Sequence, residues 1–590
     1  MYFKKKSLIL FSVFLILILI IINQRTLIAN EIRIITCQPN FTKVDDNLKN
    51  EILDIIYGIL NFSVNGCPYQ KIDINIKNKD LEILYKDREK FLKNKILFLP
   101  NEVPAVIISN KKKIKAKIRI KGDLINNWNF KKQFSLKITL NEPYKINGMR
   151  EFSLTKFSER QFPLNLIVAK QLFNLNIIVP NFYSYKININ NENWGLMLAE
   201  EQFSDTFYNV RSIDKSPIFK FTNEIGFKLN NYIYAQNKDK KKINLFNNLS
   251  KKQGVLEVKF YNSKDFINNK KYADFISIAK SINSLNSDPN LSDYEFDKIY
   301  QYLDINKFVD YFLTILIWGE FHSHYFTNMR FYFNPQSDMI EPIPTDHTNN
   351  LTNFNKFKIS LKNLDNFYKM IIKSEQFLSN YKLKLNKIDD NYFKTIENSS
   401  KSFCINFKSF KYYYDQCLKQ VNIETLKKNY KFLKNSQLNI FSDINLNFKK
   451  NNFDKELDIN NLKKLFFDIP FSSQNIYARI FDDGELRLYN LTPFNISIEK
   501  IVFFRNSNKY ISCKKYKIDK NCEKKNSKLK FNLKPSNKMN YFSYIIKDFE
   551  EFKKYSWVEI QSSIDKNKRE DFFDIEKQKY KPEIMFTNIN

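Results

Sequence analysis

The sequence predicts an α+β protein of several units, with a membrane anchor at the N-terminus and an all-β unit at the C-terminus. Three observations carry this prediction. The chain opens with an apolar run, Leu8–Ile22, strands alternate with a helix between residues 103 and 199, and short strands dominate after residue 475. The 590 residues are too many for one ordinary domain.

The composition fits a folded protein with a large core. Apolar residues make up 43% of the chain and include 56 Phe and 33 Tyr, which excludes a mainly disordered chain. The formal net charge is +32, but Lys and Arg are spread along the chain rather than gathered into one stripe. Because a nucleic-acid footprint is clustered, we expect no nucleic acid among the partners.

The N-terminus indicates the compartment. Lys4, Lys5 and Lys6 precede the apolar run, and the residues after it offer no small-x-small cleavage site. We therefore expect an uncleaved signal anchor over residues 1–30, in the inner (cytoplasmic) membrane. Basic residues hold the start of such a span in the cytoplasm, so the bulk of this single-pass chain is expected in the periplasm or outside the cell.

The six cysteines fall into local pairs. These pairs are Cys37 with Cys67, Cys404 with Cys417, and Cys513 with Cys522. Nearest-neighbour disulfides are the simplest arrangement, and an oxidising compartment permits them. Six unrelated buried thiols are the alternative.

The remaining pattern divides the chain into successive units. Residues 31–102 form a mixed preamble, strands flank a helical stretch at 164–175, and residues 231–300 form a polar connector with some helix. Asp304 then precedes an apolar stripe that predicts a capped helix ending near Gly319. Residues 360–455 are mostly helical, and short strands within 456–590 predict a β-sandwich domain.

A predicted hairpin brings two oxygen-bearing side chains together. Residues 329–344 read as two strands joined by a turn at 335–338. If Asn334 pairs near Ile340, the register places Asn328 opposite Asp346, with Cβ atoms ~5 Å apart. These two side chains would then suit one hard cation, Mg²⁺ or Mn²⁺.

An Asn before a hairpin and an Asp after it is the metal-binding layout of kinase-type active sites. Such sites place a catalytic Asp five positions before the Asn, and this chain has Ser323 there. The neighbouring groups that can accept a proton are His322, His324 and Glu320.

The histidines also allow a second interpretation. The chain has three, and all lie in the window that contains the hairpin. His322 and His324 on an extended segment would point to one side, and His347 could reach them across the hairpin. Three His around zinc form a catalytic arrangement, so a zinc hydrolase stays open at this point.

Several stretches in order, between about residues 105 and 350, resemble the CotH-type kinase family. They are Lys117–Asp123, Gln133–Leu140, Asn193–Glu201 and Asn328–Asp346. The resemblance implies an atypical kinase-like, two-lobed body over residues 103–455 that binds ATP with Mg²⁺ or Mn²⁺. Its N-lobe would span about 103–230, the connector about 231–300 and the C-lobe about 301–455.

The resemblance also implies roles for five charged residues. Lys137 would contact phosphate, and the loop that begins at Lys121, with Lys132 after it, would lie over the phosphates. Glu200 and Glu201 would lie at the hinge beside adenine. A solvated strand face is the alternative for Lys137, and an exposed strand end is the alternative for the two glutamates.

We therefore expect a membrane-anchored, extracytoplasmic, ATP- and metal-dependent transferase that phosphorylates an envelope protein or polymer. Members of the family carry an Asp as base where this chain has Ser323. A neighbouring His or Glu takes that role, or protein phosphorylation is lost. A kinase fold without its base can still bind nucleotide as a pseudokinase-like scaffold, or can transfer another part of the nucleotide.

Overall fold

The computed structural model describes residues 31–32, 34–35, 56, 59–60, 67, 69–94, 100–122, 125–157, 164–222, 257–261, 272, 275, 278–279, 282, 293–320, 322–325, 327–347, 364–405, 418, 421–436, 441, 476–481, 485–490, 496–504, 524–527, 531–533, 542–545, 557–564, 567–575 and 583–588. The predicted anchor at residues 1–30 lies outside these residues. Within them, no helix has the length and apolar character needed to cross a membrane.

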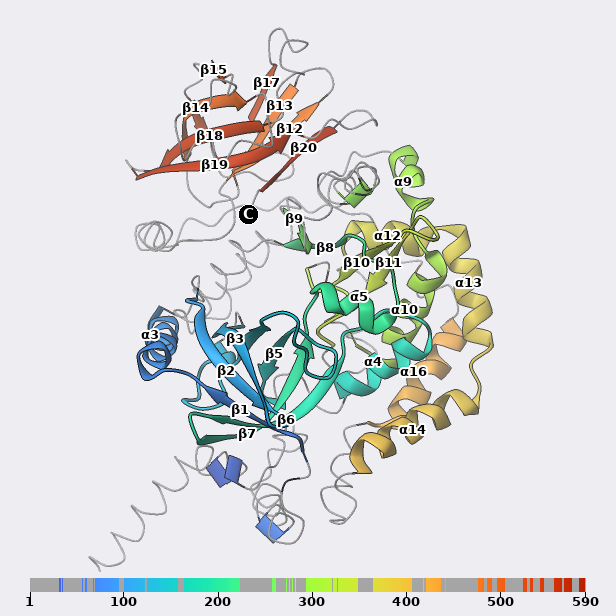
Figure 1. Ribbon diagram of the computed structural model, residues 1–590. Helices are drawn as coiled ribbons and strands as arrows, with labels where there is room; N and C mark the ends of the chain where they lie inside the picture. The colour runs from blue at the N-terminus through green and yellow to red at the C-terminus, as the bar shows by residue number, and fades with distance from the viewer. Residues whose placement is uncertain are drawn as a thin grey trace, which may run out of the picture.

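Seven strands close into a barrel, in the order β1-β2-β3-β4-β5-β7-β6 (Figure 1). They are β1 (Lys71–Asn75), β2 (Val103–Ser109), β3 (Lys112–Ile120), β4 (Leu136–Leu140), β5 (Glu151–Thr155), β6 (Phe182–Ile189) and β7 (Glu192–Glu201). Neighbours are antiparallel except β1 and β6, whose parallel pairing closes the ring. Closure leaves no free strand edge.

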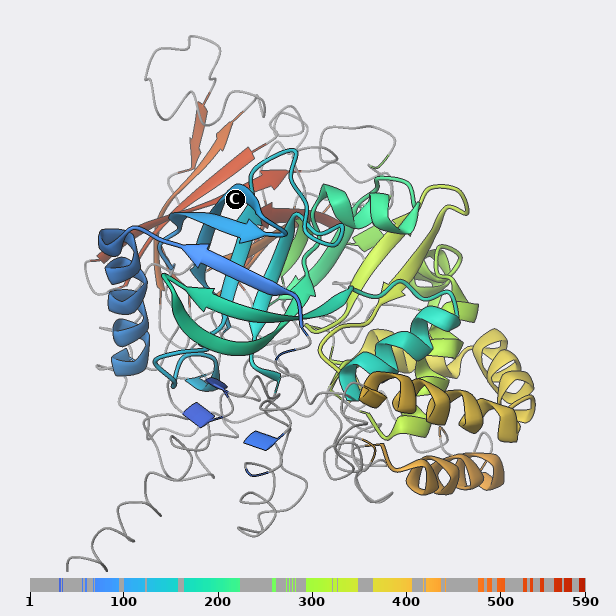
Figure 2. The same ribbon diagram turned by 60° about the horizontal axis from the view of Figure 1, so that its bottom comes forward.

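Alternation in sequence explains the barrel strands. In β4, Leu136, Ile138 and Leu140 are fully buried, while Lys137 and Thr139 are only half-buried. Helix α3 (Asn78–Asn94) packs on the outside against β2 and β3 (Figure 2). A short 3₁₀ turn, Ile125–Asn127, lies in the loop between β3 and β4.

The helices gather on the other side of the molecule and form the largest core (Figure 1). They are α4 (Leu164–Asn174), α9 (Asp293–Tyr300), α10 (Ile305–Trp318), α12 (Asn366–Lys373), α13 (Glu375–Asn386), α14 (Asp390–Cys404) and α16 (Ile423–Ser436). Helix α5 (Asp205–Arg211) instead contributes Phe207 and Tyr208 to a smaller cluster. Helix α10 packs against α4, α13 and α16, and most of its side chains are buried. The mixed strand and helix content confirms the α+β class.

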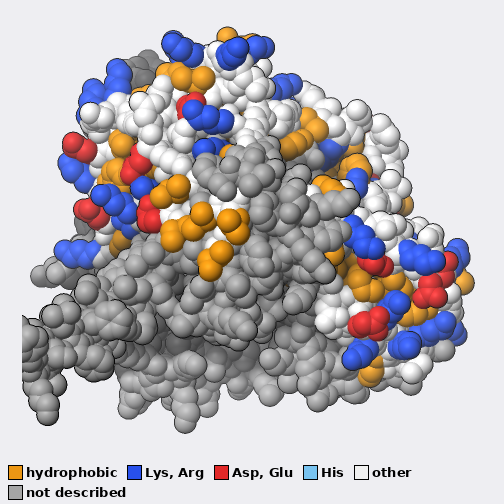
Figure 3. Space-filling view, turned by 90° about the horizontal axis from the view of Figure 1, so that it is seen from below, with side chains coloured by type: hydrophobic (Ala, Val, Ile, Leu, Met, Phe, Trp, Pro, Cys, Tyr) orange, Lys and Arg blue, Asp and Glu red, His pale blue; other side chains and the backbone are white. Residues whose placement is uncertain are grey.

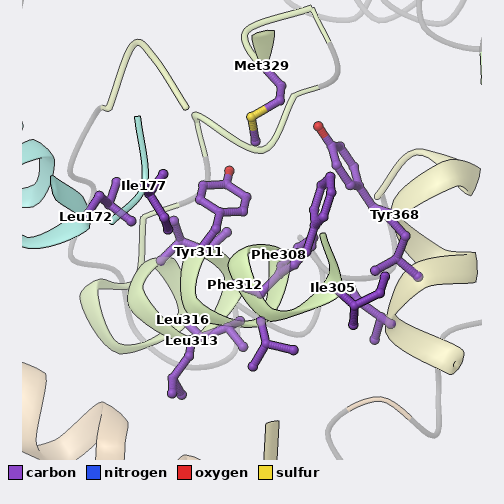
Figure 4. Packing of buried hydrophobic residues seen from close by; sticks show 14 of the residues in the cluster. Leu172, Ile177, Ile305, Phe308, Tyr311, Phe312, Leu313, Leu316, Met329 and Tyr368 are labelled. Atoms are coloured by element: carbon purple, nitrogen blue, oxygen red, sulfur yellow. The ribbon is translucent and has the colours of Figure 1, made fainter. Parts of the chain in front are cut away.

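Local signals set the ends of α10 as predicted. The Asp304 side chain accepts a hydrogen bond from the Lys307 backbone N–H at 3.1 Å. Gly319 has φ +62° and ends the helix in the left-handed conformation that glycine adopts without strain. Figure 4 shows Phe308 and Tyr311 projecting from α10 toward the segment that carries Met329.

A four-stranded antiparallel sheet, in the order β11-β10-β8-β9, lies beside one end of the barrel (Figures 1 and 2). Its strands are β8 (Ile218–Thr222), β9 (Glu257–Tyr261), β10 (Arg330–Asn334) and β11 (Met339–Ile343). Strands β10 and β11 form the predicted hairpin. Strand β9 lies where we expected only a connector with some helix, so that expectation is wrong for residues 257–261.

The C-terminal strands pair into one nine-stranded sheet, in the order β15-β14-β18-β19-β20-β12-β13-β17, with β16 beside β14. They are β12 (Ile476–Phe481), β13 (Glu485–Asn490), β14 (Ile496–Phe504), β15 (Lys524–Ser527), β16 (Phe531–Leu533), β17 (Phe542–Ile545), β18 (Trp557–Ile564), β19 (Asn567–Ile575) and β20 (Glu583–Asn588). The predicted all-β content is confirmed. Strand β20 links two groups of strands, because residues 583–585 pair with β12 and residues 586–588 pair with β19; the predicted sandwich arrangement stays a prediction.

The described residues bear only in part on two expectations, the disulfide pairing and the spread of positive charge over the surface. Cys67 and Cys404 are each disulfide-bonded, and the other cysteine of each bond lies outside the described residues, so the proposed pairing stays a prediction. On the face seen in Figure 3, Lys and Arg side chains are interspersed with acidic and apolar ones.

Candidate functional site

The loop after α10 is organised around one buried carboxylate, that of Glu320. Its side chain is only 1% exposed. One oxygen, Oε1, accepts the backbone N–H groups of His322 at 2.6 Å and Ser323 at 3.0 Å, and Oε2 accepts the Ser323 hydroxyl. Glu320 therefore anchors the loop, and its burial leaves no room for the role of a base that touches an acceptor.

Neighbouring groups stabilise the ionised form of the Glu320 carboxylate. Burial raises the pKa of Glu320, but His347 and the hydrogen bonds from Ser323 outweigh it, so the pKa lies below its ordinary value. His347 Nδ1 lies 3.6 Å from Glu320 Oε2, and both side chains are buried. Tyr311 Oη lies 3.0 Å from Ser323 Oγ, and burial together with Glu320 raises the pKa of Tyr311 well above its ordinary range.

Two of the sequence-predicted residues meet at the accessible part of the site. His322 Nε2 lies 3.0 Å from Asp346 Oδ2, and the two side chains are 39% and 32% exposed. His324 is buried and stacks on Tyr325 with ring centroids 4.8 Å apart. Of the two histidines proposed as bases, His322 is therefore the one that solvent and a substrate can reach.

The hairpin register differs by one residue from the predicted register. Asn334 pairs with Met339 and Arg330 with Ile343. Continuing this register places Asn328 opposite Thr345, whose hydroxyl donates to the Asn328 carbonyl at 2.6 Å. The predicted opposition of Asn328 and Asp346 is wrong.

A different geometry brings Asn328 and Asp346 to the same loop. Asp346 adopts φ +59°, a left-handed turn that Asp tolerates better than most residues, and reaches His322. Asn328 Nδ2 donates to the His322 backbone carbonyl at 3.0 Å. Because only the amide nitrogen can donate to a carbonyl, this bond also fixes the orientation of the Asn328 oxygen, Oδ1.

These side chains fit a hard divalent cation. Asn328 Oδ1 and the Asp346 carboxylate are oxygen donors, and Mg²⁺ is commonly held by one or two carboxylates together with substrate phosphates. Among the described residues, no three His, Cys, Asp or Glu side chains gather closely enough to hold a metal ion. The arrangement of three His around zinc is therefore not formed.

The charged residues expected to bind nucleotide are mostly engaged elsewhere. Lys137 Nζ lies 2.7 Å from Glu151 on the neighbouring strand, and Lys132 Nζ lies 3.2 Å from Glu31 and 3.4 Å from Glu192. These pairings show that both cations lie against carboxylates of the protein, and their role as phosphate ligands stays a prediction.

The two glutamates expected at the hinge are buried. Glu201 forms an ion pair with Arg211 at 2.6 Å and accepts the Asn181 side chain at 2.9 Å, which ties β7 to α5. Glu200 is 6% exposed, and its backbone carbonyl accepts the Gln202 side chain at 3.4 Å. Glu201 thus has a structural role in this fold.

Lys121 lies at the end of β3, close enough to β9 to act on Tyr261, and its expected place over the phosphates stays a prediction. Its backbone N–H bonds to Ser135 at 2.9 Å, and its charge lowers the pKa of Tyr261 on β9. The loop that follows is held by Trp128, whose indole N–H donates to the Gly122 carbonyl at 2.8 Å. Gly122 has φ +97°, and a Cβ there would lie 2.3 Å from Asn127, so the turn requires glycine.

Sequence reasoning missed the cations of the four-stranded sheet. Lys220 on β8 stands directly opposite Arg330 on β10 and also opposite Lys259 on β9. The alternation of residues 218–222 was the available signal, because it sets Lys220 among apolar residues. Its neighbours could not be known without the long-range pairing of β8 with β9.

The fold and site define a protein whose loop and hairpin present an Asn, an Asp and a His beside a closed barrel. The chain belongs to the CotH kinase family, since the family model described as CotH kinase protein matches residues 118–447. This membership confirms the resemblance seen in the sequence and indicates a kinase-type function. No curated protein matches the chain closely enough to be named as a relative.

Proposed function

We propose that this protein is an ATP- and divalent-metal-dependent transferase that moves a phosphoryl or related group onto an envelope protein or polymer. Membership in the CotH kinase family supports the class of reaction. The observation that carries the proposal is the connected group of Asn328, His322 and Asp346, with contacts of 3.0 Å between neighbours. These are an oxygen donor, a proton acceptor and a carboxylate at one accessible place.

Each side chain has a defined task in this proposal. Asn328 Oδ1 and the Asp346 carboxylate would hold Mg²⁺ or Mn²⁺, which would neutralise charge on the transferred group. A carboxylate can only accept, so His322 Nε2 carries the proton in its bond to Asp346. In the neutral ring Nδ1 is then the proton acceptor, and it would take the proton of the attacking hydroxyl.

The N-terminal sequence supports the compartment in this proposal. The three lysines and the apolar run that follows them are those of a signal anchor. We propose that the chain is anchored in the inner membrane, with the catalytic part outside the cytoplasm and an envelope substrate within its reach.

One observation favours a second candidate, a pseudokinase-like scaffold. Ser323 occupies the position of the usual base and is fully buried in the Glu320 network. A scaffold of this kind would bind nucleotide or a partner without turnover. Transfer of radiolabel from ATP onto envelope extract separates the two candidates, because a scaffold transfers none.

The first test is a thermal-shift titration of the full-length chain in detergent with Mg-ATP and Mn-ATP, beside Asp346→Asn. A ligand at 100 times its dissociation constant stabilises the native state by ~2.7 kcal/mol, which is readily measured. We expect the wild type to shift and Asp346→Asn not to shift. The matched control is Asp338→Asn, an exposed Asp of the same hairpin that also has positive φ, at +54°. Equal shifts in all three proteins would refute the metal site.

A further inference from the structure

The β8–β10 sheet carries three cations in one cross-strand row. Arg330, Lys220 and Lys259 are successive opposed partners on β10, β8 and β9. Opposed residues place their side chains on the same face, with Cβ atoms ~5 Å apart. Like charges in this arrangement repel one another, and an anion bound across the row would relieve that repulsion.

Tyr261 shows the sign of the potential on this face. It lies on β9 two residues from Lys259, and Arg330 Nε lies 3.4 Å from its hydroxyl. Burial raises the pKa of Tyr261, but Arg330, Lys220 and Lys121 together outweigh burial and lower it to about 8. The barrel end therefore adds a fourth positive charge to the same region.

The row begins at the candidate metal site. Arg330 is the first residue of β10, and Asn328 lies two residues before it in the turn that precedes the strand. Its guanidinium turns back and donates to the Asn328 carbonyl at 2.5 Å and the Thr327 carbonyl at 3.2 Å. From there the row runs across two strand spacings, ~10 Å, away from β11 and Asp346.

The face that carries Arg330, Lys220 and Lys259 presents positive charge to a ligand rather than an apolar surface. The next pair along it, Ile218 and Tyr332, is buried and packs in one cluster with Phe203 and Phe207. On β9, Glu257 opposes Thr222, two positions from Lys220, and it is the acidic residue at a neighbouring register position. A purine ring needs apolar or stacking contacts, whereas phosphates need cations.

We propose that Arg330, Lys220 and Lys259 bind the terminal β,γ-diphosphate of a nucleoside triphosphate, so that the α-phosphorus lies at the metal site. A terminal phosphate carries about −1.5 to −2 charges at pH 7, more than an internal one, and matches a row of three cations best. The transferred group is then the nucleotidyl group. This inference rests on the proposed function and specifies which group of the nucleotide moves.

The step balances without a further reactant. The acceptor hydroxyl oxygen forms a bond to the α-phosphorus, and the bond from that phosphorus to the oxygen bridging the β-phosphorus breaks. The hydroxyl proton goes to His322, and pyrophosphate leaves along the cation row. Phosphoryl transfer would instead place the γ-phosphorus at Asn328 and Asp346, with the nucleoside beyond the cations.

Binding of Mg-pyrophosphate to the full-length chain tests the row without any acceptor. We expect pyrophosphate to stabilise the wild type and to compete with ATP, while sulfate at equal ionic strength has no effect. Lys220→Met and Lys259→Met should each raise the dissociation constant about tenfold, the factor that corresponds to ~1.4 kcal/mol. Lys115→Met, at an exposed strand position of the barrel, is the matched control and should not change it. No stabilisation by pyrophosphate, or an equal loss of affinity in the control variant, would refute anion binding by these three cations.

Label position tests the group that moves. Incubation of the protein with envelope extract and ATP labelled at the α-phosphorus should label the acceptor and release pyrophosphate, and label at the γ-phosphorus should not be incorporated. Incorporation of γ label alone would overturn this inference and leave the proposed transferase standing. No incorporation of either label would overturn both.

Discussion

Replacement of Glu320 tests whether one buried carboxylate holds the loop that carries His322. Glu320→Ala removes the acceptor for two backbone N–H groups and for the Ser323 hydroxyl. Each buried donor left without a partner costs ~1–3 kcal/mol, and breaking a buried charge pair costs ~3–5 kcal/mol, so we expect a loss of roughly 3–5 kcal/mol. Glu320→Gln keeps one acceptor oxygen and should cost roughly 1–2 kcal/mol.

The assay is urea unfolding of the full-length chain, followed by the fluorescence of tryptophan. Trp318 is fully buried at the end of α10, two residues before Glu320, so its signal reports on this region. Hydrogen exchange at the His322 and Ser323 amides measures the local opening directly. Glu397→Ala, in an exposed pair with Lys401, is the control and should leave both signals unchanged. A loss below ~0.5 kcal/mol for Glu320→Ala, the range of surface substitutions, would refute the anchor.

The pH dependence of the same variants has a defined sign. The pKa of Glu320 is lowered in the folded protein, so its stabilising contribution is complete above the unfolded value of ~4.3. That contribution is lost as the pH falls through the folded-state pKa. Glu320→Gln should therefore lose less stability than the wild type on acidification. Parallel acid curves for the two proteins would show that folding does not lower the pKa of Glu320.

Two further predictions concern charge around the proposed ligand. Lys137→Met should leave the affinity for Mg-ATP unchanged, because Lys137 pairs with Glu151 on the barrel, and should cost less than ~1 kcal/mol of stability; loss of Mg-ATP binding in the thermal-shift titration would restore Lys137 as the phosphate ligand. Binding of Mg-pyrophosphate should weaken as pH rises through about 8, where Tyr261 ionises beside Arg330, and Tyr261→Phe should remove this step; titrations on either side of that pKa, with the step retained in Tyr261→Phe, would assign it to another group.

Features set by neighbouring residues could be predicted from the sequence. The ends of α10 follow from Asp304 and Gly319, whose effects act within one helical turn. The alternating strands of the barrel follow from period-two burial, as in β4. These signals are local, so no knowledge of distant partners was needed.

The register of the hairpin could not be predicted from local sequence signals. Its two strands were predicted correctly, but the turn contains four residues, Pro335–Asp338, where the predicted register assumed five. Asp338 has φ +54° and completes the shorter turn, a conformation that its residue type permits but does not dictate. A register slip of one residue changes every opposed pair, which is why Thr345 and not Asp346 faces Asn328.

Charge in the site depends on contacts between distant segments, which composition and spacing do not reveal. Lys137 was assigned to phosphate by resemblance, but its strand neighbour supplies Glu151. Lys220 becomes part of a cation row only because β9 returns beside β8 after an intervening stretch of more than thirty residues. The sequence identified the loop and hairpin, whereas tertiary pairing decides which cations accompany them.

Ser323, at the position of the usual base, shows which charged groups of this site are buried and which face outward. Ser323 is buried, and the Glu320 carboxylate beside it is also inside, so the negative charge near α10 fixes the loop and does not reach a substrate. What the loop presents outward is His322, held by Asp346. If positive charge for phosphates comes from β8, β9 and β10, then metal ligands, proton acceptor and anion site all belong to one loop and one sheet. Most catalytic acceleration in such reactions comes from positioning and charge neutralisation, and both then depend on the rigidity of this sheet more than on any barrel lysine.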